Sequence, residues 1–271
     1  MPIFAPIRFT LPLPPSINQQ YFTTNGYHVL TPHSRRYRRG AEFQMAQLYR
    51  QDAIDDTFLQ AAQAMPLSLL LRFYFETPHR RDLDSGLKIV QDAIVSGGLN
   101  VDDRQVVDIR LLKFVDPQRP RVEAEVALIP EWDWGGDEHV EGPLSLRLPM
   151  APSINNQYTI VRGRRRRSAE LRRFQRAVAS LVEDSGMRAR LPDTLRRRTG
   201  GAYLACYLDF YFAAGSQRDV DSGVKASLDA TCTALGVNDN RVVDLHCTRR
   251  RSQGEAYINA EFEVLDAWSF D

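Results

Sequence analysis

A repeat within the chain constrains its fold more than any other feature of the sequence. Residues 15–21, Pro-Ser-Ile-Asn-Gln-Gln-Tyr, return as residues 152–158, Pro-Ser-Ile-Asn-Asn-Gln-Tyr, with six of seven positions identical and a shift of 137 residues. At the same shift, residues 81–88 (Arg-Asp-Leu-Asp-Ser-Gly-Leu-Lys) match residues 218–225 (Arg-Asp-Val-Asp-Ser-Gly-Val-Lys). Self-similarity over such a period indicates two copies of one structural module.

A third pair of segments shows where the two copies differ in length. Residues 103–108 match residues 239–244, now at a shift of 136, so the second copy has lost one residue between the motifs. The acidic stretch 131–138, which contains two adjacent glycines, is typical of a linker. We therefore predict two domains, residues 1–136 and 137–271, each of an ordinary domain size.

Both copies contain the same predicted order of strands and helices. Alternating apolar residues predict strands, and one apolar face with a serine cap predicts a helix over residues 168–184. A second helix is expected from about Ser85 and from about Ser222, and the closing strands of each copy are spaced as hairpins. The predicted strands are 7–11, 67–76, 105–114 and 121–129, then 144–148, 203–212, 242–249 and 256–264. This mixture favours an α+β fold in which helices pack on a mixed sheet.

Composition is that of a folded, water-soluble protein. Hydrophobic residues make up 43% of the chain and charged residues 25%, which is ordinary for a globular domain. The sequence lacks both an apolar run of membrane-spanning length and a signal-peptide pattern, so we expect a cytoplasmic protein without a membrane partner. The cysteines show no metal-ligand spacing, and we expect reduced, buried thiols at Cys206, Cys232 and Cys247.

The residues that carry chemistry follow one strand in each copy. There, Arg-Asp-x-Asp is expected at the strand end, so that Asp82 and Asp84 project to the same side. Lys88 lies four residues after Asp84 and can share its helical face, with Asp92 four residues beyond. A third carboxylate arrives with Asp103. Only three of the 35 basic residues are lysines, and two of them, Lys88 and Lys225, occupy this one repeat position.

Converging carboxylates repel one another unless a cation neutralises them. Oxygen ligands favour magnesium or manganese, which polarises phosphate and lowers the pKa of bound water, while a nearby lysine supplies positive charge to a transition state. A plainer interpretation stays open, in which the lysines form surface ion pairs and Asp-x-Asp caps a helix. Asp102 is expected to be peripheral, because the second copy has Asn238 in its place.

In these motifs both copies resemble the RusA family of Holliday junction resolvases. The matching residues are 14–18 (Pro-Pro-Ser-Ile-Asn), 80–84 (Arg-Arg-Asp-Leu-Asp), Lys88, Asp92 and 102–108. The resemblance implies modules that act as dimers and cut four-way junctions with magnesium or manganese, using three aspartates and a lysine. It assigns metal binding and catalysis to Asp82, Asp84, Asp103 and Lys88, and again to Asp219, Asp221, Asp239 and Lys225. Ser85 and Ser222 replace the asparagine usual in the family.

A fused pair of such modules predicts one chain that acts as an internal pseudo-dimer on branched DNA. DNA affinity needs positive charge near the sites, and the residues expected to contact DNA are Arg81, Arg218, Arg35, Arg36, Arg164, Arg165, Arg166, Asn18 and Asn155. Alternatives are a junction-binding protein in which one or both sites are inactive, and a nuclease for other branched DNA. A glycosyltransferase with a metal-binding Asp-x-Asp is disfavoured by the additional aspartate and lysine.

Overall fold

The computed structural model divides the chain into two compact units, with the division between Trp132 and Asp133. It describes residues 4–24, 27–78, 81–136, 142–161, 164–197 and 201–270. Residues 137 and 138 of the predicted linker lie outside this part. Each unit is described by itself below, as the first unit (residues before 133) and the second unit (residues from 133 on).

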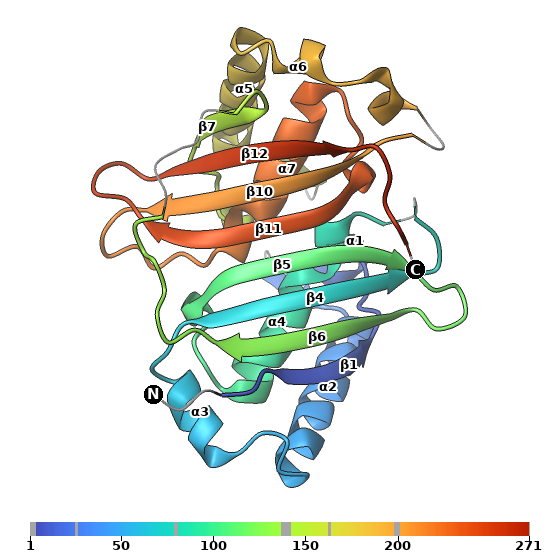
Figure 1. Cartoon of the computed structure of the whole chain (residues 1–271), viewed down its shortest axis with the longest axis vertical. Coiled ribbons are helices and arrows are strands. Elements are labelled where there is room, and N and C mark those ends of the chain that lie inside the picture. The colour runs from blue at the N-terminus through green and yellow to red at the C-terminus, as the bar shows by residue number, and fades with distance from the viewer. Residues whose placement is uncertain are drawn as a thin grey trace. The chain divides into compact units, whose positions relative to one another are not determined.

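The elements of the two units follow one another in the same order (Figure 1). In the first unit they are β1 (Ile7–Pro12), α1 (Ile17–Gln20), β2 (Tyr21–Thr24), β3 (Tyr27–Leu30), α2 (Pro32–Arg50), α3 (Asp56–Ala62), β4 (Leu67–Phe75), a 3-10 turn (Leu83–Gly86), α4 (Leu87–Gln91), a π-helical segment (Asp92–Leu99), a 3-10 turn (Asp103–Gln105), β5 (Val106–Val115) and β6 (Arg121–Leu128). In the second unit they are β7 (Ser145–Pro149), a 3-10 turn (Ile154–Asn156), β8 (Tyr158–Val161), β9 (Arg164–Arg167), α5 (Ala169–Asp184), α6 (Met187–Arg190), a 3-10 turn (Asp193–Arg196), β10 (Tyr203–Phe212), α7 (Asp221–Leu235), a 3-10 turn (Asp239–Arg241), β11 (Val242–Arg251) and β12 (Tyr257–Leu265).

Each unit contains a mixed sheet with the same strand order. In the first unit the order is β1-β6-β4-β5, where β4 pairs antiparallel with β6 and parallel with β5. In the second unit it is β7-β12-β10-β11, and β10 pairs in the same two ways. The parallel pairs also share an irregularity: the register with β5 shifts after Leu67 of β4, and the register with β11 shifts after Leu204 of β10. The predicted α+β class is confirmed.

The predicted closing hairpins are wrong. β4 lies between β5 and β6, and β10 lies between β11 and β12 (Figure 1). The physical reason is the apolar face of β4, where every second residue from Leu67 to Phe75 is at most 2% exposed. The backbone N–H and C=O groups of so buried a strand need hydrogen-bond partners along both edges, and β4 therefore takes the central position between the two later strands.

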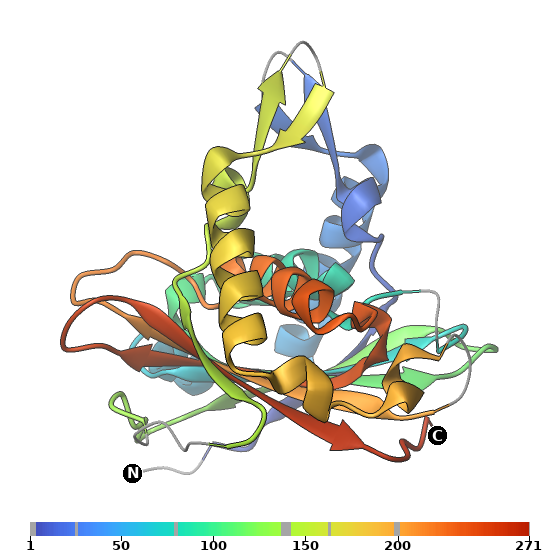
Figure 2. The same cartoon turned by 90° about the horizontal axis from the view of Figure 1, so that it is seen from above.

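Helix α5 follows the predicted boundaries because its cap and its apolar stripe agree. The Ser168 hydroxyl accepts a hydrogen bond from the Leu171 amide at 3.0 Å, which satisfies one of the free donors at the helix start. Leu171, Phe174, Val178 and Val182 form the buried stripe. In the first unit, Thr31 caps α2 in the same way through the Ser34 amide. In Figure 2, α5 and α7 lie on one face of the strands of the second unit.

The residue missing from the second copy is accounted for by the helix that follows β4 or β10. In the first unit this helix ends at the left-handed residue Asn100 (φ 54°), twelve residues after Lys88. In the second unit it ends at the left-handed residue Gly236 (φ 70°), eleven residues after Lys225. A π-helical segment holds an extra residue relative to an α-helix. The segment Asp92–Leu99 thus absorbs the insertion without moving the elements on either side.

Two short antiparallel ribbons were not anticipated from sequence. β2 pairs with β3, and β8 pairs with β9. In Figure 2 the second ribbon extends from the amino-terminal end of α5. β9 consists of the four arginines of residues 164–167, a composition that carries no strand signal because its apolar alternation is missing.

Two expectations from composition can be compared with the structure. All three cysteines are free and buried, as predicted, and burial raises the pKa of the Cys206 thiol well above its ordinary value. Among the described residues, no helix combines the length and the apolarity required to cross a membrane.

We predict that Gly223→Ala destabilises the second unit although alanine is the better helix former. A methyl group at Gly223 would lie 2.8 Å from Cε1 of the buried Phe210 and 3.5 Å from Cβ of Ala151. Overpacking costs about 1–3 kcal/mol, which exceeds the helix propensity gain of about 1 kcal/mol. Chemical denaturation should show a loss of about 1 kcal/mol, whereas Gly254→Ala, at a position with open space, should change the free energy of unfolding by less than about 0.5 kcal/mol. Equal stabilities for the two variants would contradict this packing argument.

Candidate active site

The Asp-x-Asp motif does not lie at a strand end as predicted. β4 ends at Phe75 and β10 at Phe212, seven residues before Asp82 and Asp219, respectively. Pro78 interrupts the extended chain in the first unit because proline lacks an amide donor. In the second unit Gly215 does so with a φ of +77°, a conformation that glycine adopts readily. The first aspartate of each motif therefore lies in a loop, and the second lies in the 3-10 turn Leu83–Gly86 or at the start of α7.

The two aspartates of each motif have different surroundings. The amide of the serine after the motif donates to the first aspartate's carbonyl, at 3.2 Å for Asp82 and 3.3 Å for Asp219, which closes the same turn in both units. This turn leaves the first carboxylate half-buried and encloses the second, so that Asp84 is 5% and Asp221 is 7% exposed. One acid of each pair is therefore held inside the fold, while the other stays accessible from solvent.

Lys88 connects the helix that follows this turn with the entry to the next strand. Its ammonium lies 2.9 Å from the Asp92 carboxylate and 3.5 Å from the Asp103 carboxylate. The stripe predicted from the spacing of Lys88 and Asp92 is present, and Asp103 joins it. In the second unit, Lys225 binds Asp229 at 3.0 Å, at the repeat positions of Lys88 and Asp92. Lys88 is only 21% exposed, so its positive charge is partly shielded from water and acts strongly on these neighbours.

Asp102 has a structural contact that explains why asparagine can replace it. One of its carboxylate oxygens accepts a hydrogen bond from the Arg104 amide at 3.0 Å, which caps the 3-10 turn. The Asn238 side chain accepts from the Asn240 amide at the same distance. The Arg104 guanidinium also binds Asp102 and lowers the pKa of this carboxyl to about 2. The position requires an acceptor oxygen, which both residues supply.

Two buried glutamines bind the opening Pro-Ser-Ile-Asn segment, and the one in the first unit also binds the aspartate turn. Gln20, which is fully buried, donates to the carbonyls of Pro15 at 2.9 Å and Ser85 at 3.1 Å. Gln157 donates to Pro152 in the second unit. Sequence reasoning missed these glutamines, although both occur at matching positions of the repeat.

The arginine that precedes each motif has a similar anchoring contact. Arg81 donates to the Pro14 carbonyl at 2.8 Å, and Arg218 donates to the Ala151 carbonyl at 2.6 Å. Burial lowers the pKa of both guanidinium groups. Their predicted contact with DNA remains a prediction; the structure gives them a contact with the backbone. In the first unit, Arg81 also lines a hollow of about 510 Å³ beside the opening prolines.

A cation from the neighbouring strand supports the same loop in each unit. Lys113 of β5 is fully buried, and its ammonium donates to the Pro78 carbonyl at 3.4 Å and lies 5.8 Å from the ring centroid of Phe75. Its counterpart in β11, Arg249, donates to carbonyls of Ser216 and Arg218 and lies over the Phe212 ring. Lysine is rare in this chain, and this rarity is the sequence signal that could have pointed to a special role for Lys113.

Of the other residues predicted to contact DNA, some are exposed and some have side chains that the structure does not describe. Arg35 and Arg36 are exposed on α2, Arg166 is exposed on β9, and Asn155 is exposed in a 3-10 turn. The side chains of Asn18, Arg164 and Arg165 lie outside the part of the chain that the structure describes.

The donors available in each unit are suited to one kind of metal ion. Asp82, Asp84 and Asp103 offer only carboxylate oxygens, the ligands that magnesium and manganese prefer. A partly shielded lysine lies beside Asp103, and phosphate chemistry needs such a charge.

Known proteins are similar in sequence to the first unit. The family model described as Endodeoxyribonuclease RusA matches residues 12–127. Relatives called crossover junction endodeoxyribonuclease RusA are 30% identical in Shigella sonnei and 31% identical in Escherichia coli K12 and in Enterobacteria phage 82. Each alignment covers 117 residues, 43% of this chain and 90% of the relative.

The chain belongs to the RusA family. The match to the RusA model begins at the end of β1 and extends to the end of β6, so it contains the opening proline segment, the aspartate turn and the 3-10 turn at Asp103. The first unit is therefore a nearly entire RusA domain. The assignment of individual catalytic residues remains a prediction.

We predict that Lys113→Met loosens the aspartate loop without unfolding the unit. A hydrogen bond from a charged donor contributes about 1.5–3 kcal/mol, but removing a buried charge offsets much of that loss. The free energy of unfolding should change by about 1 kcal/mol or less, while amide exchange at Asp82 and Leu83 should accelerate about tenfold. Lys113→Arg, which imitates Arg249, should preserve the protection. Unchanged exchange in Lys113→Met would show that the loop is held by other contacts.

Proposed function

We propose that this protein is an endodeoxyribonuclease that cuts four-way DNA junctions, with one active centre in each unit. Family membership supports an endonuclease, and the relatives' names specify crossover junctions. The observation that carries the proposal is the Lys88 contact with Asp103, because it joins the helix that follows the aspartate turn to the acidic motif before β5.

A divalent metal is part of the proposal. Asp82, Asp84 and Asp103 would hold it in the first unit, and Asp219, Asp221 and Asp239 in the second. When bound, magnesium or manganese supplies a Lewis acid for the scissile phosphate and lowers the pKa of a water ligand. The donor sets consist of carboxylates alone, which favours these hard ions over zinc or copper.

The chain's own residues have separate tasks in this proposal. Lys88 and Lys225 place an ammonium where negative charge develops on the phosphate, and Asp92 and Asp229 orient that ammonium through the ion pairs described above. Arg81, Gln20 and Lys113 act as positioning residues, because they bind backbone carbonyls on both sides of the aspartate turn. A site held in this way needs little reorganisation when DNA binds.

A junction is resolved only when two strands are cut. Related proteins of one module provide two centres by pairing, and the resemblance noted above implies that such pairs are the active form. We propose that the repeated chain provides both centres itself, as an internal pseudo-dimer. Exposed cations, among them Arg35, Arg36 and Arg166, would bind the phosphates of the junction.

Metal binding is expected to stabilise the protein because it relieves repulsion among the carboxylates. At a magnesium or manganese concentration one hundred times Kd, each occupied site should raise the free energy of unfolding of its own unit by about 2.7 kcal/mol. Calorimetry should detect one class of site in each unit, and the double variant Asp82→Asn/Asp219→Asn should lose most of the heat. Absence of both heat and stabilisation in the unaltered protein would remove the metal from the proposal.

Inactivation of one centre is expected to leave a nickase. A supercoiled plasmid with an extruded cruciform should be linearised by the unaltered protein, whereas Asp82→Asn or Asp219→Asn should yield mainly nicked circles. The double variant should yield neither product and still bind the junction, since its arginines remain.

The cleavage rate of the Asp219→Asn variant distinguishes this proposal from its main alternative. If Asp219→Asn linearises the plasmid as fast as the unaltered protein, the second unit only binds, and two first units from separate chains must come together. If neither the unaltered protein nor either variant cuts any junction with magnesium or manganese, the protein is a junction-binding relative that has lost cleavage.

A further inference from the structure

The second unit carries a basic groove between α5 and α7 that no part of the predicted catalytic site uses. Its volume is about 1280 Å³, and five arginines line it against a single acidic residue, Glu183. The arginines are Arg167, Arg172, Arg176, Arg188 and Arg196. This excess of basic over acidic side chains in the groove is large for a chain whose net charge is only +1.

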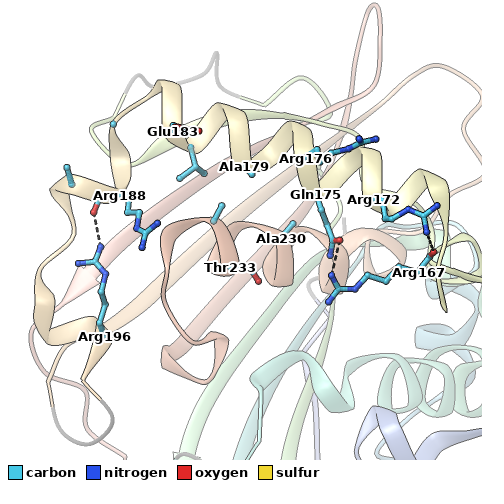
Figure 3. A pocket seen from close by; sticks show the side chains of 14 residues that line it. Arg167, Arg172, Gln175, Arg176, Ala179, Glu183, Arg188, Arg196, Ala230 and Thr233 are labelled. Carbon is cyan, nitrogen blue, oxygen red and sulfur yellow. Dashed lines mark hydrogen bonds between the residues drawn. The ribbon is translucent and has the colours of Figure 1, made fainter. Parts of the chain in front are cut away.

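The arginines lie at both ends of the groove, as Figure 3 shows. At one end, Arg167 donates to the Gln175 side chain at 3.3 Å, and Arg172 donates to the Arg167 carbonyl at 2.8 Å. At the other end, Arg196 donates to the Arg188 carbonyl at 2.9 Å. These contacts order the side chains before any ligand binds, which lowers the entropic cost of binding.

Small side chains form the middle of the groove. Ala179 and Val182 come from α5, and Ala230 and Ala234 come from α7. Because they are short, a ligand's backbone can approach the helices closely between the two basic ends. From Arg172 to Glu183, α5 rises about 17 Å, which corresponds to about five nucleotides of one DNA strand.

The same helix face of the first unit is built differently. At the position of Ala179, α2 has Glu42, whose carboxylate pairs with Arg38 at 3.2 Å and lies against Gly97. At the position of Val182 it has Met45, which packs against Gly98. The second copy has thus replaced a long acidic side chain and a long apolar one with shorter, uncharged residues, which opens and charges this face.

We propose that this groove binds the phosphate backbone of a duplex arm of the DNA substrate. The proposal rests on the proposed function and adds a binding surface in the second unit, where Arg172 and Arg176 share the repeat positions of Arg35 and Arg39 and Ala179 replaces an acidic side chain. Phosphodiesters are the chemistry that repeated arginines on an open groove recognise, through bidentate and charge-assisted hydrogen bonds. The contacts are made to phosphates, so the groove adds affinity without sequence preference.

The test is DNA binding by the cleavage-inactive protein, Asp82→Asn/Asp219→Asn, in the absence of metal. Adding Arg172→Gln, Arg176→Gln and Arg188→Gln should weaken binding to a four-way junction and to a linear duplex, and should reduce the slope of log K against log salt by about 2 to 3. The matched control is the triple variant Arg147→Gln/Arg190→Gln/Arg251→Gln, since these arginines are exposed in the second unit but do not line the groove. It should reduce the slope by less than 1.

A second variant tests whether weaker DNA binding comes from the altered charge or from misfolding. Ala179→Glu gives the second unit the residue that the first unit has, and a helix tolerates glutamate well. It should weaken duplex binding while circular dichroism and thermal unfolding stay unchanged.

Three outcomes can be distinguished. If the groove variants lose DNA affinity and their slope of log K against log salt decreases, the groove proposal is supported. If the inactive parent binds junctions and the triple variant binds them equally well with the same salt slope, the groove proposal falls and the proposed function stands. If the parent binds no DNA at all at low salt, both proposals fall.

Discussion

The parallel pairing of β4 with β5, repeated in β10 with β11, is the constraint on which the other features depend. Parallel neighbours cannot be joined by a tight turn and need a crossover, here a helix. That helix begins at the aspartate turn, carries Lys88 near its start, and delivers the chain to β5 at Asp103. In the first unit this crossover brings two acidic motifs and a lysine together in one short stretch of the chain, where we propose that the chemistry takes place.

The partner of each cation explains whether its position accepts both lysine and arginine or lysine alone. Lys113 in β5 and Arg249 in β11 both bind backbone carbonyls of the aspartate loop. A carbonyl accepts from an ammonium or a guanidinium equally well, so either residue serves. Lys88 and Lys225 are lysine in both copies, and both bind carboxylates. A compact ammonium fits among several carboxylates where a broad guanidinium does not, in agreement with a role in the proposed chemistry.

The two copies share their strand order and differ in parts of their helices. The π-helical segment of the first unit and the regular helix of the second reach the same next element with different residue counts. On the adjoining helix, Glu42 and Ala179 occupy one repeat position and create faces of opposite character. Core positions resist such changes because close-packed neighbours would have to move. Surface positions are free to diverge, and this freedom underlies the separate binding role proposed for the second unit.

Several features followed from the sequence alone, because they depend on residues close together in the chain. The repeat, the buried strand β4, the capped helix α5 and the Lys88–Asp92 pair all arise from local spacing. Tertiary structure decided which strands are neighbours, and it placed β4 between β5 and β6 against the hairpin expectation. It also decided that Asp84 is enclosed and that Gln20 holds its turn. Strand partners and buried anchors depend on contacts across the whole fold, where the burial of apolar surface outweighs the preference for local connections.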